Sequence, residues 1–203
     1  MNIPSREEFL SGCEEFEKHE KRDAMYKVAT FLVSHFWGKP SDMADGLGVL
    51  LLTWNQAFYR YGIFDFDKLE KCITENWEKI ENFRNRDLSS LSDIDVASIK
   101  EVFAKFLEAL KIDSGKKQGT KSPVSVAKAL HLLAPNFFPL WDDKIARAYE
   151  CHYNDRPAGK YVSFCKLTRN MVDGLKSCIN RPDKTVIKLI DEYNYSKYTK
   201  KWI

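Results

Sequence analysis

The sequence predicts an all-α fold in which helices enclose one core or two small lobes. Apolar residues recur at helical spacing through most of the chain, and the alternation typical of strands is nowhere sustained. The 203 residues, 44% of them hydrophobic, are enough to bury a core. We therefore expect a single globular helical unit over residues 1–203, as a two-lobed bundle with one lobe at 40–112 and the other at 1–39 plus 113–203.

Up to residue 110, four apolar stretches predict helices. One stripe consists of Met25, Val28, Ala29, Leu32, Val33 and Phe36. A denser apolar run over 47–58 is typical of a central helix surrounded by others. An amphipathic helix follows over 66–80, with Asp65 or Asp67 available as its N-cap. The stripe over 102–110 predicts a fourth helix.

The apolar pattern breaks over 113–123, where Gly, Lys and Ser predominate, and this break indicates a loop that leads into a helix over 123–134. Pro123 suits the first turn of that helix because its missing N–H would have had no partner there. The run 134–139 contains two prolines and ends the helix, and Asp142 is a suitable N-cap for the next one. Two more helices are expected, over 160–175 and 183–192.

Charge is distributed unevenly along the chain, although the net charge is only +3. Residues 1–100 contain 13 Lys and Arg against 18 Asp and Glu, whereas residues 101–203 contain 19 against 11. A basic half favours a polyanion partner, most often nucleic acid, because lysines near phosphates release condensed counterions. The alternative is a solvated basic surface without a partner.

The sequence disfavours several classes of protein. No stretch approaches the ~20 apolar residues that a membrane helix needs, so we expect no membrane partner. The acidic residues 1–20 do not resemble a secretory signal, and we expect a cytoplasmic monomer, nucleoid-associated if it binds DNA. The five cysteines are far apart and the four histidines lack zinc-site spacing, so we expect neither disulfides nor a metal. Motifs of phosphate-binding loops and serine hydrolases do not occur, and no cofactor is expected.

The helix predicted over 123–134 is apolar on almost every side, apart from a narrow stripe formed by Ser125, Lys128 and His131. A lysine in partly apolar surroundings loses its proton more easily, which is the condition under which lysine acts as a nucleophile. The alternative is that the stripe faces water and that Lys128 pairs with Asp142 or Asp143 of the following helix.

Two segments of the chain resemble the core of the helix-hairpin-helix DNA glycosylases, a family that includes endonuclease III and the 8-oxoguanine glycosylases. They are Ser122-Pro-Val-Ser-Val-Ala-Lys128-Ala-Leu and Phe138-Pro-Leu-Trp-Asp142-Asp-Lys-Ile-Ala-Arg. Pro123 and Lys128 match the proline and the nucleophilic lysine of the family pattern, and Asp142 matches its aspartate. Upstream, Leu50-Leu-Leu-Thr-Trp-Asn-Gln56 resembles the family's I-L-S-Q-Q helix, so the resemblance covers roughly residues 45–150.

The resemblance implies a two-lobed DNA repair enzyme with a helix-hairpin-helix element, a glycosylase (a hydrolase) and AP lyase that flips and excises a damaged base such as 8-oxoguanine. It implies that Lys128 attacks C1′ and forms a Schiff base, while Asp142 assists deprotonation of the lysine and stabilises positive charge on the sugar. The residues expected to line the substrate pocket are Trp54, Asn55, Gln56, His131, Phe138 and Trp141.

The sequence differs from the family pattern at both hairpin glycines, which are replaced by Val124 and Val126. In the family these glycines let backbone N–H groups approach a DNA phosphate. Either the segment 115–120 supplies that contact instead, or the fold persists without its chemistry, as a helical module that binds nucleic acid or protein. The expected DNA-binding residues are Lys116, Lys117, Gly119, Lys121, Ser125 and Lys144.

Overall fold

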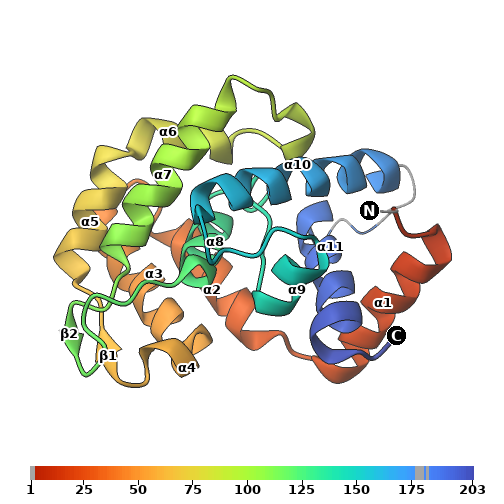
Figure 1. Ribbon diagram of the computed structural model, residues 1–203, viewed down its shortest axis with the longest axis horizontal. Coiled ribbons are helices and arrows are strands. Elements are labelled where there is room, and N and C mark those ends of the chain that lie inside the picture. The colour runs from red at the N-terminus through yellow and green to blue at the C-terminus, as the bar shows by residue number, and fades with distance from the viewer. Residues whose placement is uncertain (1–2, 177–180, 182) are drawn as a thin grey trace.

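The computed structural model describes residues 3–176, 181 and 183–203, and it confirms the all-α fold (Figure 1). In chain order the α-helices are α1 (Arg6–His19), α2 (Ala24–His35), α3 (Pro40–Trp54), α4 (Gln56–Tyr59), α5 (Phe66–Glu75), α6 (Trp77–Arg84), α7 (Asp95–Ala109), α8 (Pro123–Leu133), α9 (Asp143–Ala148), α10 (Pro157–Leu175) and α11 (Val186–Asn194). The shorter elements are strands β1 (Gly62–Ile63) and β2 (Ser114–Gly115), the 3-10 turn η1 (Leu88–Ser90) and the π-helical turn η3 (Tyr195–Lys200).

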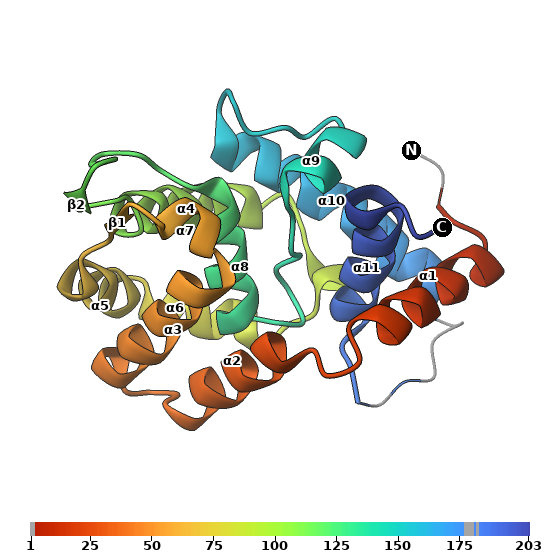
Figure 2. The ribbon, with the colours of Figure 1, turned by 90° about the horizontal axis from the view of Figure 1, so that it is seen from below.

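The helices form two groups, which Figures 1 and 2 show from two directions. Helices α2 to α8 lie on one side, and α1, α9 and α11 lie with η3 on the other. Helix α10 packs against α7 and η1 in the first group and against α11 in the second, so it spans both. Helix α1 packs along α11, which brings together two segments from opposite ends of the sequence.

This packing differs from the expected lobes at 40–112 and at 1–39 plus 113–203. Helices α2 and α8, which the expectation placed in the second lobe, pack against α3 and so belong with the first group. Ala29, Val33 and Leu130, from these two helices, are fully buried in the same core as α3. Apolar periodicity shows which face of a helix is buried, but not which neighbour covers that face.

The structure does not confirm the expected helix-hairpin-helix element. The connection from α7 to α8 covers residues 110–122 and contains β2, which pairs antiparallel with β1. Gly115 is required at this pairing because its φ is +115° and an added Cβ would lie 2.4 Å from the carbonyl oxygen of Tyr61. The segment from Pro123 to Lys128, which matched the family pattern, lies inside α8.

Two expected helices are each divided by an asparagine. The run 47–58 is divided into α3 and α4 at Asn55, whose side-chain amide donates to the hydroxyl of Ser125 at 2.6 Å. The next expected helix is divided into α5 and α6 at Asn76, whose side-chain amide donates to the carbonyl of Cys72 at 2.7 Å. The Asn76 side chain thus competes for a hydrogen bond with the local backbone, whereas the Asn55 side chain bonds across to α8.

Helix α8 lies at the centre of the first group, packed against α2, α3 and α7. Pro123 occupies its first turn as expected, and the Ser122 hydroxyl caps it by accepting the Ser125 N–H at 3.1 Å. Every residue over 126–133 is buried except Lys128. We expected α3 to be the central helix, but the surface of its residue Val49 is 54% exposed, so one side of α3 faces solvent.

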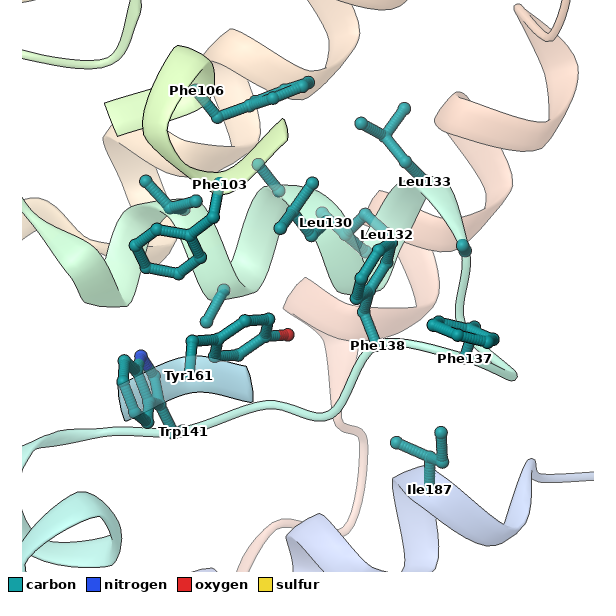
Figure 3. Close-up of a cluster of buried hydrophobic side chains, with 14 of the residues drawn as sticks. Phe103, Phe106, Leu130, Leu132, Leu133, Phe137, Phe138, Trp141, Tyr161 and Ile187 are labelled. Atoms are coloured by element: carbon teal, nitrogen blue, oxygen red, sulfur yellow. The ribbon is translucent and has the colours of Figure 1, made fainter. Parts of the chain in front are cut away.

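Aromatic side chains fill the space between α8 and its neighbours (Figure 3). The rings of Phe103 and Tyr161 lie 4.9 Å apart, and the ring of Phe138 lies 5.0 Å from Phe83 and 6.3 Å from Tyr161. Phe138, which we expected in the substrate pocket, is therefore a core residue. It turns inward because the connection after α8 carries it beneath that helix (Figure 3).

We predict that Phe138→Ala lowers the free energy of unfolding by about 3–5 kcal/mol, because it leaves a cavity that the packed rings cannot close. Urea denaturation followed by circular dichroism measures the loss. The control is Ile94→Ala, since Ile94 is 88% exposed. The control should change stability by less than about 0.5 kcal/mol, and an equal effect of the two substitutions would contradict the core assignment.

Candidate active site

A pocket of about 320 Å³ lies between the two groups of helices, within the size range common for small-ligand sites. Six of the residues that line it are Trp54, Lys128, Trp141, Asp142, Lys188 and Asp191. Trp54 and Lys128 come from the first group, and Lys188 and Asp191 come from α11 of the second. The exposed Glu20 also lines this cavity, so it opens to solvent on that side. We call it the Lys128 pocket.

Lys128 reaches the pocket from α8, where it is the one residue over 126–133 that is not fully buried. Its Nζ donates to the carbonyl oxygen of Trp54 at 2.8 Å and lies 4.7 Å from the centre of the Trp54 ring. Burial lowers the pKa of Lys128 to about 8, and the negative charges of Asp191 and Asp142 only partly oppose that effect. A lysine with this pKa is neutral in a substantial fraction of molecules near pH 7–8.

The sequence left open that Lys128 pairs with Asp142 or Asp143 in water. Asp143 pairs instead with Arg147 at 2.9 Å and with His152 at 2.8 Å. Within the described part of the chain, Lys128 forms no ion pair with a carboxylate, and the carbonyl of Trp54 is its hydrogen-bond acceptor. Lys128 therefore lies in the partly apolar surroundings that the sequence indicated, and it does not form the water-exposed pair with Asp142 or Asp143.

Asp142 lines the same pocket and caps α9 as the sequence predicted. Its Oδ1 accepts the N–H of Ile145 at 2.8 Å, and its Oδ2 accepts the hydroxyl of Thr199 at 2.5 Å. The connection that carries Asp142 crosses the space between the two groups of helices (Figure 2). Asp142 is therefore held in place by one bond within its own helix and one from η3.

A second lysine, Lys188, lies in the pocket wall with only 2% of its surface exposed. Its Nζ is 3.0 Å from Asp23, 3.4 Å from Asp191 and 3.7 Å from Glu192. The ammonium also lies within 4.6 Å of the ring centres of Phe16 and Tyr26. Burial alone would lower the pKa of Lys188, but the three carboxylates outweigh it and raise the pKa above its usual value.

The two lysines of the pocket are thus opposite in character. Lys188 is held as an ammonium by three carboxylates, whereas Lys128 has been moved toward the neutral amine. A neutral amine is a nucleophile and an ammonium is not. The pocket therefore contains one lysine suited to attack an electrophilic carbon and one suited to carry a fixed positive charge.

Of the residues expected to line the substrate pocket, the structure brings only Trp54 and Trp141 to the Lys128 pocket. Asn55 is bonded to Ser122 and Ser125, and Gln56 is exposed at the start of α4. His131 and Phe138 are buried in the core.

His131 was expected near the substrate, but it is fully buried between two hydrogen-bond partners. Its Nδ1 lies 2.7 Å from the carbonyl oxygen of Phe138, and its Nε2 lies 3.1 Å from the hydroxyl of Tyr26. Burial lowers its pKa to about 4, so it is neutral at physiological pH. His131 lies on the same stripe of α8 as Lys128, but it does not reach the pocket because Tyr26 of α2 covers it.

The four lysines expected to bind DNA are all exposed, but two of them already have partners within the protein. Lys116 and Lys117 are exposed beside β2, and the Lys117 Nζ lies 5.5 Å from the Tyr61 ring centre. Lys121 pairs with Glu108, and Lys144 donates to the carbonyl of Thr199 at 2.8 Å, although both lysines are exposed.

Two of the expected DNA contacts are corrected by the structure. The N–H of Gly119 donates to the carbonyl of Ile112 at 2.7 Å, so it is not free to donate to a phosphate. Ser125 is fully buried, and its hydroxyl accepts the Asn55 amide. Both residues hold the α7–α8 connection in place instead of presenting donors to DNA.

No cluster of three or more metal-ligating side chains is found among the residues that the structure describes. Four cysteines, Cys13, Cys72, Cys151 and Cys165, are buried free thiols, and Cys178 lies outside the described residues. The helices of residues 3–176 and 183–203 include none that is long and apolar enough to cross a membrane.

Comparison of the chain with known protein families, with curated proteins and with solved structures finds no match in any of the three.

Sequence analysis missed Lys188, Asp191 and Asp23. A signal for the first was present, because Lys188 and Glu192 stand four residues apart within the apolar run of α11. Charged side chains among apolar neighbours indicate a buried ion pair. Asp23 gave no such signal, since it lies in a short charged connection between α1 and α2 and reaches Lys188 only through the tertiary fold.

The depressed pKa of Lys128 predicts a pH-dependent cost to stability. Below pH 8 both the folded and the unfolded chain carry the charge, so the cost of burying it is fully present. Between pH 8 and 10.5 the unfolded chain binds a proton that the folded chain does not, so stability rises across this window. Lys128→Met should therefore raise the free energy of unfolding at pH 7 by roughly 1–3 kcal/mol, and this gain should shrink toward pH 10.5.

Urea denaturation of both proteins between pH 7 and 10.5 measures this difference. Lys71→Met is the matched control, because the Lys71 side chain is 75% exposed. A gain for Lys128→Met that stayed constant over the whole pH window would show that Lys128 is not held at a depressed pKa.

Proposed function

We propose that this protein is a DNA glycosylase with AP lyase activity, in which Lys128 is the nucleophile and the Lys128 pocket receives an extruded base and its sugar. The observation that carries the proposal is that a lysine with a pKa near 8 lies in a pocket with a fixed aspartate and two tryptophans. The resemblance of the segments around Lys128 and Asp142 to the helix-hairpin-helix glycosylases supports the same assignment.

The size and lining of the pocket suit a nucleotide that has left the base stack. An enzyme that acts on C1′ must extrude the nucleotide, since C1′ cannot be reached inside the duplex. Trp54 is partly exposed and offers an aromatic surface on which a flat base can stack, at about 1–3 kcal/mol per base in comparable sites. Trp141 lines the pocket but is only 2% exposed, so it supports the pocket wall and presents no open face. Base–aromatic stacking tolerates any base, so Trp54 supports nucleobase binding without specifying the lesion.

The chemistry follows from the positions of Lys128 and Asp142. The neutral Nζ of Lys128 forms a bond to C1′, the bond from C1′ to the base breaks, and its electron pair leaves with the base. The nitrogen then loses a proton, the bond from C1′ to the ring oxygen breaks, and that oxygen takes the electron pair and a proton to become a hydroxyl. A protonated Schiff base between Nζ and C1′ results. The carboxylate of Asp142, fixed by Ile145 and Thr199, stabilises positive charge on the sugar. Loss of a proton from C2′ expels the 3′ phosphate and cleaves the strand.

The distribution of charge supports a duplex as the substrate. Lys116 and Lys117 extend from the β1–β2 pair into solvent, where phosphates can reach them. The pocket itself is lined by Glu20, Asp23, Asp142 and Asp191, which repel phosphate. Phosphate contacts are therefore assigned to the exposed lysines and not to the pocket.

The proposal predicts that wild-type protein is captured covalently on a duplex that contains an abasic site when borohydride is present. Borohydride reduces the Schiff base to a stable secondary amine, which shifts the protein band on a denaturing gel. Lys128→Gln should lower the trapped yield at least 100-fold, since a side-chain amide cannot form the bond. Mass spectrometry of the adduct should place it on Lys128.

The matched control is Lys71→Gln, which removes a 75% exposed lysine on α5 and should trap as wild type does. Trapping that survives Lys128→Gln would refute the lysine mechanism. Wild-type protein that binds DNA without forming an adduct on an abasic site or 8-oxoguanine would favour the alternative, a helical module that binds nucleic acid without chemistry.

The assignment of phosphate contacts predicts a change in salt dependence. Lys116→Ala and Lys117→Ala should each reduce the slope of log affinity against log salt by about 1, because each removed lysine no longer releases a counterion. Fluorescence anisotropy with a labelled duplex between 50 and 200 mM salt, about the range over which such contacts weaken, measures the slope. Lys18→Ala on α1 is the control, and a slope equal to that of Lys18→Ala would exclude these two lysines from the interface.

A further inference from the structure

Four carboxylates line the Lys128 pocket, and each is a potential acceptor for the proton that Lys128 must lose. They are Glu20, Asp23, Asp142 and Asp191. A proton acceptor needs a free oxygen that faces the amine, and it needs greater basicity than an ordinary solvated carboxylate. The four differ in the hydrogen bonds and charges that their oxygens already meet and in their exposure to water.

In Asp142, the residue that resembles the aspartate of the glycosylase family, both carboxylate oxygens already accept a hydrogen bond. Oδ1 accepts the N–H of Ile145 and Oδ2 accepts the hydroxyl of Thr199, at 2.8 and 2.5 Å. The bond to Oδ1 is the N-cap of α9. Both bonds therefore hold the oxygens of Asp142 toward donors of α9 and η3.

Asp23 and Glu20 are also poor acceptors. The Oδ2 of Asp23 lies 3.0 Å from the Lys188 ammonium, the shortest of that lysine's three carboxylate contacts, so this oxygen is already paired. Glu20 is exposed at the end of α1, where water solvates its carboxylate.

Asp191 differs from these three. Its side chain is only 14% exposed, and among the described residues it accepts one hydrogen bond, a long one from the Lys188 Nζ to Oδ2 at 3.4 Å. Its Oδ1 accepts no hydrogen bond from the residues that the structure describes. Burial raises the pKa of Asp191, and the nearby charge of Lys188 opposes that effect only in part. Asp191 is thus a largely buried carboxylate in the wall of the pocket, and one of its oxygens has no hydrogen-bond donor among the described residues.

We infer that Asp191, and not Asp142, accepts the proton of Lys128 before the lysine attacks. This inference rests on the proposed function and names the proton acceptor of that same site. Lys188 is the positioning residue for it, since its ammonium holds the Oδ2 side of Asp191 and leaves Oδ1 to face the pocket. Asp142 then acts only as the fixed anion beside the sugar.

The proton is conserved through this step. The Lys128 ammonium gives one proton to Oδ1 of Asp191, directly or through one pocket water, and leaves a neutral amine beside a neutral carboxyl. The amine forms its bond to C1′, and the departing base takes the electron pair of the broken bond. The Asp191 carboxyl can then give its proton to that base, which restores the carboxylate without an outside acid.

Several titratable groups face Asp191 and enter its pH dependence. They are Lys188 and Glu192 of α11, Asp23 and Tyr26 at the start of α2, Lys128 of α8, Asp142 at the N-terminus of α9, Glu20 after α1 and Tyr195 of η3. Lys188 is the cation nearest to Asp191 among the described residues, and removing it would leave Asp23 and Asp191 without their ammonium, although Glu192 would keep its pair with Lys184. The informative substitutions are therefore at Asp191 itself.

The effect of Asp191→Asn separates a proton acceptor from a mere neighbouring charge. The substitution removes a negative charge beside Lys128, which increases the fraction of neutral lysine and by itself would speed Schiff-base formation at pH 7. If Asp191 is the acceptor, trapping must slow in spite of this increase. We expect a decrease of roughly 100-fold in the rate of trapping on an abasic-site duplex, and partial recovery in Asp191→Glu.

The rate of trapping should be measured with cyanoborohydride from pH 5 to 8.5 for the wild type, Asp191→Asn, Asp142→Asn and the control Asp45→Asn. Asp45 is an exposed residue of α3 and should leave the profile unchanged. In the wild type the rate should be level between the pKa values of Asp191 and Lys128, because the proton stays within the pair, and it should fall only below the pKa of Asp191. In Asp191→Asn the rate should instead fall continuously with decreasing pH from the pKa of Lys128, whereas Asp142→Asn should keep the level region. A faster Asp191→Asn at pH 7, or loss of the level region in Asp142→Asn, would overturn the inference.

A second measurement needs no DNA and remains informative if the proposed function fails. Reductive methylation by formaldehyde and cyanoborohydride, quantified at Lys128 by peptide mass spectrometry, reports the pH at which that lysine becomes neutral. Asp191→Asn should lower the half-point by about one pH unit, and Asp142→Asn should lower it less. An unchanged half-point in Asp191→Asn would show that Asp191 does not face Lys128, whereas absence of trapping by wild-type protein would refute only the glycosylase proposal.

Discussion

The burial of α8 is the constraint on which the rest of the structure depends. This helix is apolar on almost every side, so the first group of helices must surround it, and the aromatic side chains of α7, α10 and the α8–α9 connection fill the remaining space. Lys128 is the one residue over 126–133 that the surrounding helices do not cover fully. The pocket lies beside Lys128, where α11 and its neighbours in the second group face α8 but do not pack tightly against it.

The contrast between the two pocket lysines shows how the surroundings of a side chain determine its chemistry. Both are largely removed from water, which disfavours the ammonium. Lys188 meets three carboxylates within 3.7 Å and keeps its charge, whereas Lys128 meets a carbonyl oxygen and an aromatic ring. A carbonyl dipole and a ring face stabilise a cation less than a carboxylate does, and so burial determines the protonation of Lys128.

The parts of the fold that depend on local sequence could be predicted. Pro123 at the first turn of α8 and Asp142 and Asp65 as N-caps are confirmed, since capping involves residues only a few positions apart. The breaks at Asn55 and Asn76 could not be predicted, because asparagine also occurs inside helices. Tertiary placement was the main source of error: periodicity put His131 on the stripe of Lys128 but did not show that the packing of α2 would cover it. The residues around Lys188 meet only through contacts between segments far apart in the sequence.

The hydrogen bond from Thr199 to Asp142 has a consequence for the order in which the molecule is assembled. The first group of helices is complete once residue 133 has been added, apart from the support of α10, and it includes the core residues Leu47, Phe106 and Leu130. The pocket instead depends on Lys188, Asp191 and η3, which the ribosome makes more than 50 residues later, at about 5–20 residues per second. During synthesis the helices around α8 can therefore pack seconds before the pocket forms, and Lys128 meets the side chains of α11 only after that helix has been made.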